Sequence, residues 1–291
     1  MYDVIIVGAG PAGLTAAIYA LRGNKKVLVL EEKAYGGQII NAASIENYPG
    51  IKEISGFDYA TTLYNQVIDF GGEIKYESVL RISNTKEVET NSNKYQAKAI
   101  IIANGVERKV LGLPREQELV GKGVSYCATC DGNFFRGKDV AVVGGGNTAL
   151  EDALYLSNIA NKVYLIHRRD TFRGEEHYVS ELRNKSNVEF ILNTNITKLN
   201  GEVLDSIELD NGKTIKVNGL FIAIGQTPNN KRFENVVELN EEGYIKTFDG
   251  VHTSSPHIYV AGDTREKDLR QLTTAVADGS IAGTFAIKDN N

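Results

Sequence analysis

Two glycine-rich segments set 136 positions apart constrain the fold of this chain more than any other feature. The first, Gly8-x-Gly10-x-x-Gly13, follows the apolar run Val4–Val7, and the second, Gly144-x-Gly146-x-x-Ala149, follows Val140–Val143. Apolar residues at helical spacing come next in both copies, and a second apolar run then follows, at Val27–Leu30 and Val163–Ile166. Each copy therefore predicts a strand, a tight turn, a helix and a parallel strand.

The positions of the glycines fit a phosphate-binding turn. The first glycine permits the tight turn, the second lets the backbone approach a pyrophosphate, and the third position packs the helix against the strand. Free amides at the start of the helix would then hold the phosphates. A single motif of this kind is often an ordinary glycine turn. Two copies, each between a strand and a helix, favour an α/β fold with two Rossmann-like, three-layer dinucleotide-binding domains.

The residues that close the second strand of each copy differ in charge. Glu31 and Glu32 close it in the first copy, where a carboxylate can accept hydrogen bonds from a ribose diol. His167, Arg168 and Arg169 close it in the second, and Arg173 follows. Guanidinium groups at the ribose end suit a 2′-phosphate, although a solvated basic strand end would have the same composition. We therefore assign the first copy to FAD and the second to NADPH.

Cys127 and Cys130, the two cysteines of the chain, form a Cys-x-x-Cys pair ahead of the second glycine loop. In a reducing compartment such a pair is either catalytic or half of a metal site. Structural zinc needs about four ligands, yet the chain has no second cysteine pair and its four histidines show no matching spacing. The pair therefore predicts a redox dithiol, placed to relay electrons from a nicotinamide through a flavin to a disulfide.

Composition excludes several other classes of protein. The net charge of −5 disfavours a general nucleic-acid binder. No apolar stretch approaches the roughly 18–20 residues that span a bilayer. The first strand begins almost at once, which leaves no room for a signal peptide, so we expect a cytoplasmic location.

The combined motifs resemble those of the low-molecular-weight, bacterial-type, NADPH-dependent thioredoxin reductases. The motifs that carry this resemblance run nearly end to end: Gly8–Gly13, Gly36-Gly37-Gln38, Glu46–Gly50, Cys127–Asp131, Gly144–Ala149, His167–Asp170 with Arg173, Ala261–Asp263 and Arg270-Gln271. The resemblance implies the pyridine nucleotide-disulfide oxidoreductase class II fold, with a discontinuous FAD-binding domain at 1–112 and 244–291. An NADPH-binding domain at 113–243 would carry the dithiol, and the chain would cross between domains near Gly112–Lys122 and Asn235–Gly243.

The glycine loops and the resemblance together predict the residues that contact cofactors. For FAD they are Gly8, Gly10, Pro11, Ala12, Gly13, Glu31, Glu32, Gly37, Gln38, Asn47, Gly105, Gly262, Asp263, Arg270 and Gln271. For NADPH they are Gly144, Gly146, Asn147, Thr148, His167, Arg168, Arg169 and Arg173. A helix from about Leu272 to Ile287 would direct its positive end at the flavin ring.

Three of these predictions have alternatives in the sequence. Asp263, after the apolar run Ile258–Val260, suits a ribityl hydroxyl but is also an ordinary turn residue. Asp131 is either the acid that protonates a departing thiolate or a carboxylate at a helix start. Asn104 replaces the threonine of the family's Ala-Thr-Gly signature, which leaves any contact by that threonine open.

The resemblance implies a homodimeric flavoprotein that passes electrons from NADPH through FAD and the Cys127–Cys130 disulfide to thioredoxin. The two domains would rotate between half-reactions, because the nicotinamide and the disulfide must each reach the flavin. A different small dithiol partner, such as a glutaredoxin-like or peroxidase-reducing protein, would suit the same residues. A flavin donor to ferredoxin or flavodoxin and a non-enzymatic redox sensor are further alternatives, disfavoured respectively by the cysteine pair and by the intact NADPH motifs.

Overall fold

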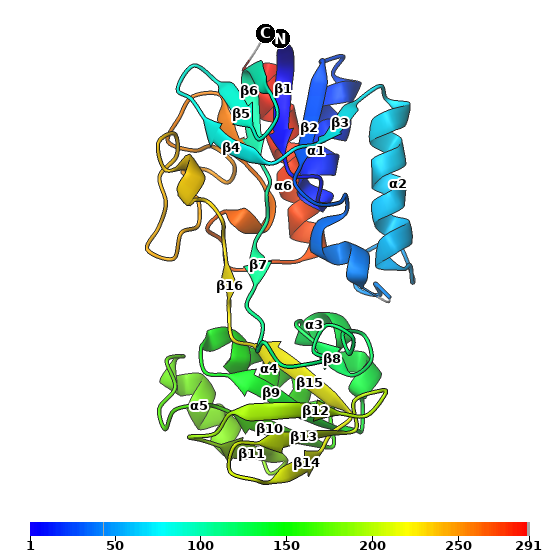
Figure 1. Ribbon diagram of the computed structural model, residues 1–291, viewed down its shortest axis with the longest axis vertical. Helices are drawn as coiled ribbons and strands as arrows, with labels where there is room; N and C mark the ends of the chain where they lie inside the picture. The colour runs from blue at the N-terminus through cyan, green and yellow to red at the C-terminus, as the bar shows by residue number, and fades with distance from the viewer. Residues whose placement is uncertain (43, 290–291) are drawn as a thin grey trace. The chain divides into compact units, whose positions relative to one another are not determined.

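The computed structural model describes residues 1–42 and 44–289. The chain forms two compact units, residues 1–107 with 227–291 and residues 108–226 (Figure 1). It passes from one to the other at two short paired strands, β7 (Glu107–Arg108) and β16 (Gln226–Thr227). Each unit contains one of the glycine-rich loops, as the sequence repeat predicts.

The first unit is built on a sheet in the strand order β3-β2-β1-β6-β5-β4, with β17 also paired to β6. Its central strands are parallel, and β4 and β5 are antiparallel to their neighbours. The strands are β1 (Tyr2–Val7), β2 (Val27–Glu31), β3 (Glu73–Tyr76), β4 (Val79–Ile82), β5 (Glu87–Thr90), β6 (Lys94–Ile102) and β17 (Ile258–Val260). The helices are α1 (Pro11–Arg22), α2 (Gly56–Asp69) and α6 (Leu272–Lys288), with the 3₁₀ turns η1 (Gly37–Asn41), η3 (Lys231–Phe233) and η4 (Gly262–Thr264).

Both faces of this sheet are buried, since alternate residues of β1 enter different cores. Val4 and Ile6 pack with α1 and α6 on one face, while Ile5 and Val7 pack on the other. Helices α1 and α6 lie against each other (Figure 1), and glycines permit the close approach: a β-carbon at Gly279 would lie 2.2 Å from the carbonyl oxygen of Ala12. This packing brings the start of α6 to the loop that begins α1.

The second unit repeats the arrangement around a parallel sheet in the order β11-β10-β9-β15-β8. Val140 and Val142 of β9 pack under α4, whereas Ala141 and Val143 pack under the antiparallel sheet β12-β13-β14. The result is the predicted three-layer arrangement. Its elements are β8 (Val124–Ser125), α3 (Ala128–Asp131), η2 (Gly132–Phe135), β9 (Asp139–Gly144), α4 (Asn147–Ser157), β10 (Lys162–Ile166), α5 (Glu176–Arg183), β11 (Val188–Ile191), β12 (Ile196–Asn200), β13 (Ser206–Leu209), β14 (Thr214–Lys216) and β15 (Gly219–Ala223).

The units divide at other residues than those expected from the sequence. The expected bounds were 112/113 and 243/244, but the structure divides at 107/108 and 226/227. The larger difference arises because Phe233, Val236 and Val237 are buried in the core of the first unit, against β1 and β6. The glycine and charged residues of 235–243 therefore belong to a surface segment of the first unit and do not mark a crossing.

Candidate functional site

Glycine is required for different reasons at the three positions of the first loop. A β-carbon at Gly8 would lie 2.4 Å from the carbonyl oxygen of Ala103, and one at Gly13 would lie 2.0 Å from that of Gly8. Gly10 has ordinary extended angles, and its β-carbon would meet only the Cα of Gly37, at 4.0 Å. The protein itself therefore needs glycine at the first and third positions. At the second position, glycine leaves a space open. A phosphate can enter this space and accept hydrogen bonds from the first-turn amides of α1.

The second loop repeats this division. A β-carbon at Gly144 would lie 2.3 Å from the carbonyl oxygen of Ala223, whereas one at Gly146 would meet nothing within 4 Å. Helix α4 begins directly after Gly146 and has no side-chain cap. Asn147, its first residue, exchanges hydrogen bonds with Glu175 (3.2 and 2.8 Å), while Thr148 is exposed beside it. The open space and the uncapped helix start fit a dinucleotide pyrophosphate.

Gly145 is a loop residue that the motif did not single out, although the three consecutive glycines were its signal. The ring of His167 covers it so closely that a β-carbon would lie 2.1 Å from the ring. The carbonyl oxygen of Gly145 accepts the amide of Arg173 at 2.7 Å, so the basic segment is bonded directly to the glycine loop. His167 itself is buried and stacked on Phe172, and its burial lowers its pKa. The ring supports the loop; a contact with NADPH by His167 stays a prediction.

The predicted arginines lie on the surface at the end of β10. Arg168, Arg169 and Arg173 are all exposed. Among the ion pairs of residues 1–42 and 44–289, none involves these three guanidinium groups. Three cations without a carboxylate partner, one of which (Arg173) is bonded to the glycine loop by its backbone amide, fit the 2′-phosphate of NADPH.

The two glutamates at the end of β2 have protein partners. Glu31 accepts the amide of Ala9 at 2.7 Å and that of Lys33 at 2.8 Å, so its carboxylate fixes the glycine loop. Glu32 lies 3.4 Å from the guanidinium of Arg232. Both lie at the predicted strand end, and each carboxylate retains lone pairs for a ribose hydroxyl.

Other predicted FAD residues gather around the first loop. Gly37 faces Gly10 and adopts a positive φ of 57°, and Gln38 donates to the carbonyl oxygen of Val106 at 2.6 Å. Gly105 has a φ of 65° and open space where a β-carbon would stand. Pro11 and Ala12 form the first turn of α1, where proline is favoured.

Asn104 has a structural explanation. Its side chain accepts the hydroxyl of Thr264 at 2.9 Å and donates to the side chain of Asn230 at 3.1 Å. Asn230, fully buried, was not found from the sequence; it donates to the carbonyl oxygens of Gly243 and Thr264. An amide that both donates and accepts thus links the segment after β6 to turn η4.

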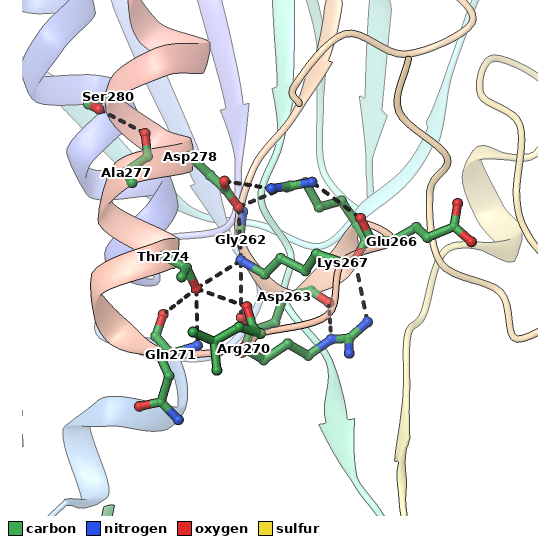
Figure 2. A network of polar contacts seen from close by, with 12 residues as sticks. Gly262, Asp263, Glu266, Lys267, Arg270, Gln271, Thr274, Ala277, Asp278 and Ser280 are labelled. Atoms are coloured by element: carbon green, nitrogen blue, oxygen red, sulfur yellow. Dashed lines mark hydrogen bonds and ion pairs between the residues drawn. The ribbon is translucent and has the colours of Figure 1, made fainter. Parts of the chain in front are cut away.

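Turn η4 and the start of α6 form a dense polar network, shown in Figure 2. Gly262, with a φ of 80°, begins the turn, one residue (Ala261) after the end of β17, and Asp263 follows. Arg270 donates to the carbonyl oxygen of Asp263 at 3.3 Å, and its guanidinium lies over the ring of Tyr244. Gln271 caps α6 in a capping box, and Asn47 donates to its side chain at 3.2 Å. The structure therefore brings the predicted residues 47, 262, 263, 270 and 271 to one helix start.

The cysteines form a disulfide at the start of α3. Cys127 is the N-cap residue, and its sulfur accepts the amide of Cys130 at 3.2 Å. Once the disulfide is opened, the same amide would stabilise a thiolate at Cys127. Cys130 is exposed and Cys127 half-buried. The geometry is that of a reversible dithiol at a helix start.

Asp131 lies in the first turn of α3, where the helix-start alternative expects a carboxylate, and it is also bonded beside the dithiol. Its carboxylate accepts the hydroxyl of Ser125 at 2.6 Å, and the same hydroxyl accepts the amide of Cys127 at 3.1 Å. Burial raises the pKa of Asp131, opposed by the Ser125 bond and the charge of Arg108. Its side chain does not cap turn η2. A carboxyl group that holds its proton more tightly than usual, one serine away from the dithiol, suits proton delivery to a leaving thiolate.

Asp152 of α4 is a second carboxyl group near the dithiol, and the sequence gave no signal for it. Burial and the adjacent Glu151 raise its pKa to about 7, while a hydrogen bond from the amide of Ala128 acts in the opposite direction. Ala128 is the residue directly after Cys127. Helices α3 and α4 are in contact.

In the described part of the chain, no helix is long and apolar enough to cross a membrane. The same residues contain no group of three or more His, Cys, Asp or Glu side chains placed to hold a metal ion.

Comparison with known proteins identifies the family. The pyridine nucleotide-disulphide oxidoreductase family matches residues 2–279. Thioredoxin reductase of Bacillus subtilis is 43% identical over 97% of this chain and 92% of its own, and that of Treponema pallidum is 42% identical over 98% and 96%. The crystal structure of thioredoxin reductase from Streptococcus pyogenes superposes with a TM-score of 0.95 at 41% identity, over 99% of this chain and 98% of the other. The chain therefore belongs to the thioredoxin reductase family of FAD- and NADPH-dependent pyridine nucleotide-disulphide oxidoreductases.

Proposed function

We propose that this chain reduces the disulfide of thioredoxin with electrons from NADPH. The observation that carries the proposal is the Cys127–Cys130 disulfide in the unit whose glycine loop is flanked by three exposed arginines. FAD, when bound, would accept a hydride from NADPH and pass two electrons to a disulfide. The loop at Gly8–Gly13, with turn η4 and the start of α6, would hold the FAD. The loop at Gly144–Ala149, with Arg168, Arg169 and Arg173, would hold the NADPH.

The dithiol chemistry follows from thiol–disulfide exchange. Two electrons open the Cys127–Cys130 bond and leave two thiolates, of which one takes up a proton from solvent. One thiolate then attacks a sulfur of oxidised thioredoxin, forming a mixed disulfide and releasing a thioredoxin thiolate. The second cysteine attacks the mixed disulfide, re-forms the Cys127–Cys130 bond and releases the other sulfur as a thiolate. In our proposal Asp131 supplies a proton to a leaving thiolate and recovers it through water.

A rotation of one unit against the other would let both redox partners reach the flavin. The dithiol and the arginine-flanked loop belong to residues 108–226, whereas the proposed FAD residues belong to the first unit. Two short strands, β7 and β16, carry both chain crossings. Such crossings can serve as hinges, because few residues must change their backbone angles.

The finer properties of the enzyme are part of the same proposal. Because the chain resembles thioredoxin reductases, we infer that it forms a homodimer, acts in the cytoplasm and has thioredoxin as its partner. Other small dithiol proteins would use the same dithiol chemistry. A donor to ferredoxin or flavodoxin is not favoured, because such a donor would have no use for the disulfide.

An anaerobic titration tests this function. The purified, FAD-containing protein is titrated with NADPH and then with NADH, as wild type, Cys127→Ser and Cys130→Ser. We expect four electrons per wild-type subunit and two in either variant. Thioredoxin reduction that survives loss of either cysteine, or a preference for NADH, would contradict the proposal.

A further inference from the structure

A buried carboxylate braces the turn that carries Asp263 (Figure 2). Asp278, on α6, accepts two hydrogen bonds from Arg265, both at 2.9 Å, one from Lys267 at 2.9 Å and one from the amide of Gly262 at 3.1 Å. The side chains of Asp278 and Lys267 are only 7% and 6% exposed. The cluster therefore joins η4 to α6 through a carboxylate with no room for a further partner.

Lys267 is the member of this cluster that the helix itself does not need. Its ammonium lies 3.2 Å from the hydroxyl of Thr274, at the end of α6 where the helix dipole disfavours a cation. The capping box of Gln271 and Thr274 already satisfies the helix start. A buried ammonium also costs free energy unless it is paired. Stability of α6 alone thus gives no reason for a lysine at this position.

The position of Lys267 between two carboxylates supplies a reason. Its ammonium lies 2.9 Å from Asp278 and 3.8 Å from Oδ1 of Asp263. Burial raises the pKa of Asp278, but the bonds from Arg265 and Lys267 outweigh this and hold it below the usual value. The ammonium of Lys267 thus lies between the Asp278 and Asp263 carboxylates and pairs with both.

We propose that Lys267 is a positioning residue for FAD, which Asp278 holds against Asp263 so that the Asp263 carboxylate keeps its orientation. This inference rests on the proposed function, in which Asp263 accepts a ribityl hydroxyl of FAD. Lys267 acts through Asp263 and needs no contact with the cofactor. If Lys267 only stabilised the turn, its replacement should have the same effect whether residue 263 is aspartate or asparagine.

A double-mutant cycle separates these two roles. FAD is removed from full-length wild type, Lys267→Met, Asp263→Asn and the double variant. The dissociation constant for FAD is then measured by quenching of flavin fluorescence, and apoprotein melting temperatures check folding. Lys246→Met is the matched control, because Lys246 is an exposed lysine of the same unit and loses the same charge.

We expect Lys267→Met to weaken FAD binding at least about tenfold, and Lys246→Met to leave it within about threefold. The double variant should bind within about threefold of Asp263→Asn alone, because the lysine has no carboxylate left to orient. Wild-type affinity in Lys267→Met, or a double variant weaker than that limit, overturns the inference.

A second variant and the wild-type control separate the possible outcomes. Should Lys267→Met not fold, Lys267→Gln retains a hydrogen-bond donor without the charge; it should also weaken FAD binding, and wild-type affinity would overturn the inference. Wild-type apoprotein that binds no FAD would instead refute the proposed function itself. Normal wild-type binding with an unaffected Lys267→Met refutes only the role of the lysine.

Discussion

Gly146→Ala should weaken NADPH binding in a protein that folds as before. The new β-carbon would meet no protein atom within 4 Å, and the backbone φ of −100° suits any residue. Restricting the unfolded chain favours alanine by about 0.4–1 kcal/mol. Alanine is a poorer N-cap than glycine by a similar amount. The free energy of unfolding should therefore change by less than about 1 kcal/mol.

The effect on the cofactor should be much larger. The methyl group occupies the space through which a pyrophosphate approaches the amides of α4, and one lost charge-assisted hydrogen bond is worth about 1.5–3 kcal/mol. We therefore expect NADPH to bind roughly 10- to 150-fold more weakly. The assay is calorimetric titration of the oxidised holoenzyme with NADP⁺, with FAD content and melting temperature as controls.

The matched variant is Gly144→Ala, in the same loop. Its β-carbon would lie 2.3 Å from the carbonyl oxygen of Ala223, so it should lower the melting temperature. Wild-type NADP⁺ affinity in Gly146→Ala, or a loss of stability equal to that of Gly144→Ala, would refute the division between structural and ligand-facing glycines.

Three further predictions concern charge. Arg168→Gln with Arg169→Gln should weaken NADPH binding by about 1.5–3 kcal/mol per lost charge-assisted bond and leave NADH unchanged, with exposed Arg183→Gln as control; equal losses for both nucleotides would count against a 2′-phosphate site. Asp131→Asn should slow thioredoxin reduction about 10²-fold or more while flavin reduction by NADPH stays normal in stopped-flow traces; an unchanged turnover would exclude Asp131 as the acid. Asp152 has a folded-state pKa of about 7 against 3.8 unfolded, so the folded protein holds the proton more tightly and loses stability as pH rises from about 4 to 7. Asp152→Asn should therefore raise stability at pH 8, by at most about 4 kcal/mol, with little gain at pH 4 in urea melts; a gain that is the same at both pH values would contradict the assigned pKa.

The sequence predicted those parts of the fold that local chemistry decides. Both βαβ units, α6 and β17 were predicted, because glycine turns and apolar periodicity follow from the backbone. The second crossing was placed too late. Polar residues at 235–243 looked like a linker, but Phe233, Val236 and Val237 are buried against strands about 130 to 230 residues earlier in the chain. Burial against distant strands leaves no local pattern.

The same limit explains which site residues were missed. Asp152 and Asp278 lie on helices where a carboxylate ordinarily faces solvent, and only tertiary packing buries them. Asn230 and Ser125 act through partners that the fold brings together, as in the bond from Ser125 to Asp131. By contrast, the arginines after β10 could be proposed from the sequence, because their position is counted from the glycine loop.

Contacts within the protein hold both glycine loops in place. Gly8, Gly13 and Gly144 are each fixed by contacts with protein backbone, and Arg173 is bonded to Gly145 by its own amide. These contacts fix the loop backbone within each unit, so selectivity between nucleotides depends on side chains outside the loops. Affinity can then be set at the strand ends, where carboxylates occupy one unit and free guanidinium groups the other. These carboxylates and guanidinium groups are exposed or half-exposed. The preference for one nucleotide over another can therefore change by substitution at the strand ends without disturbing either core.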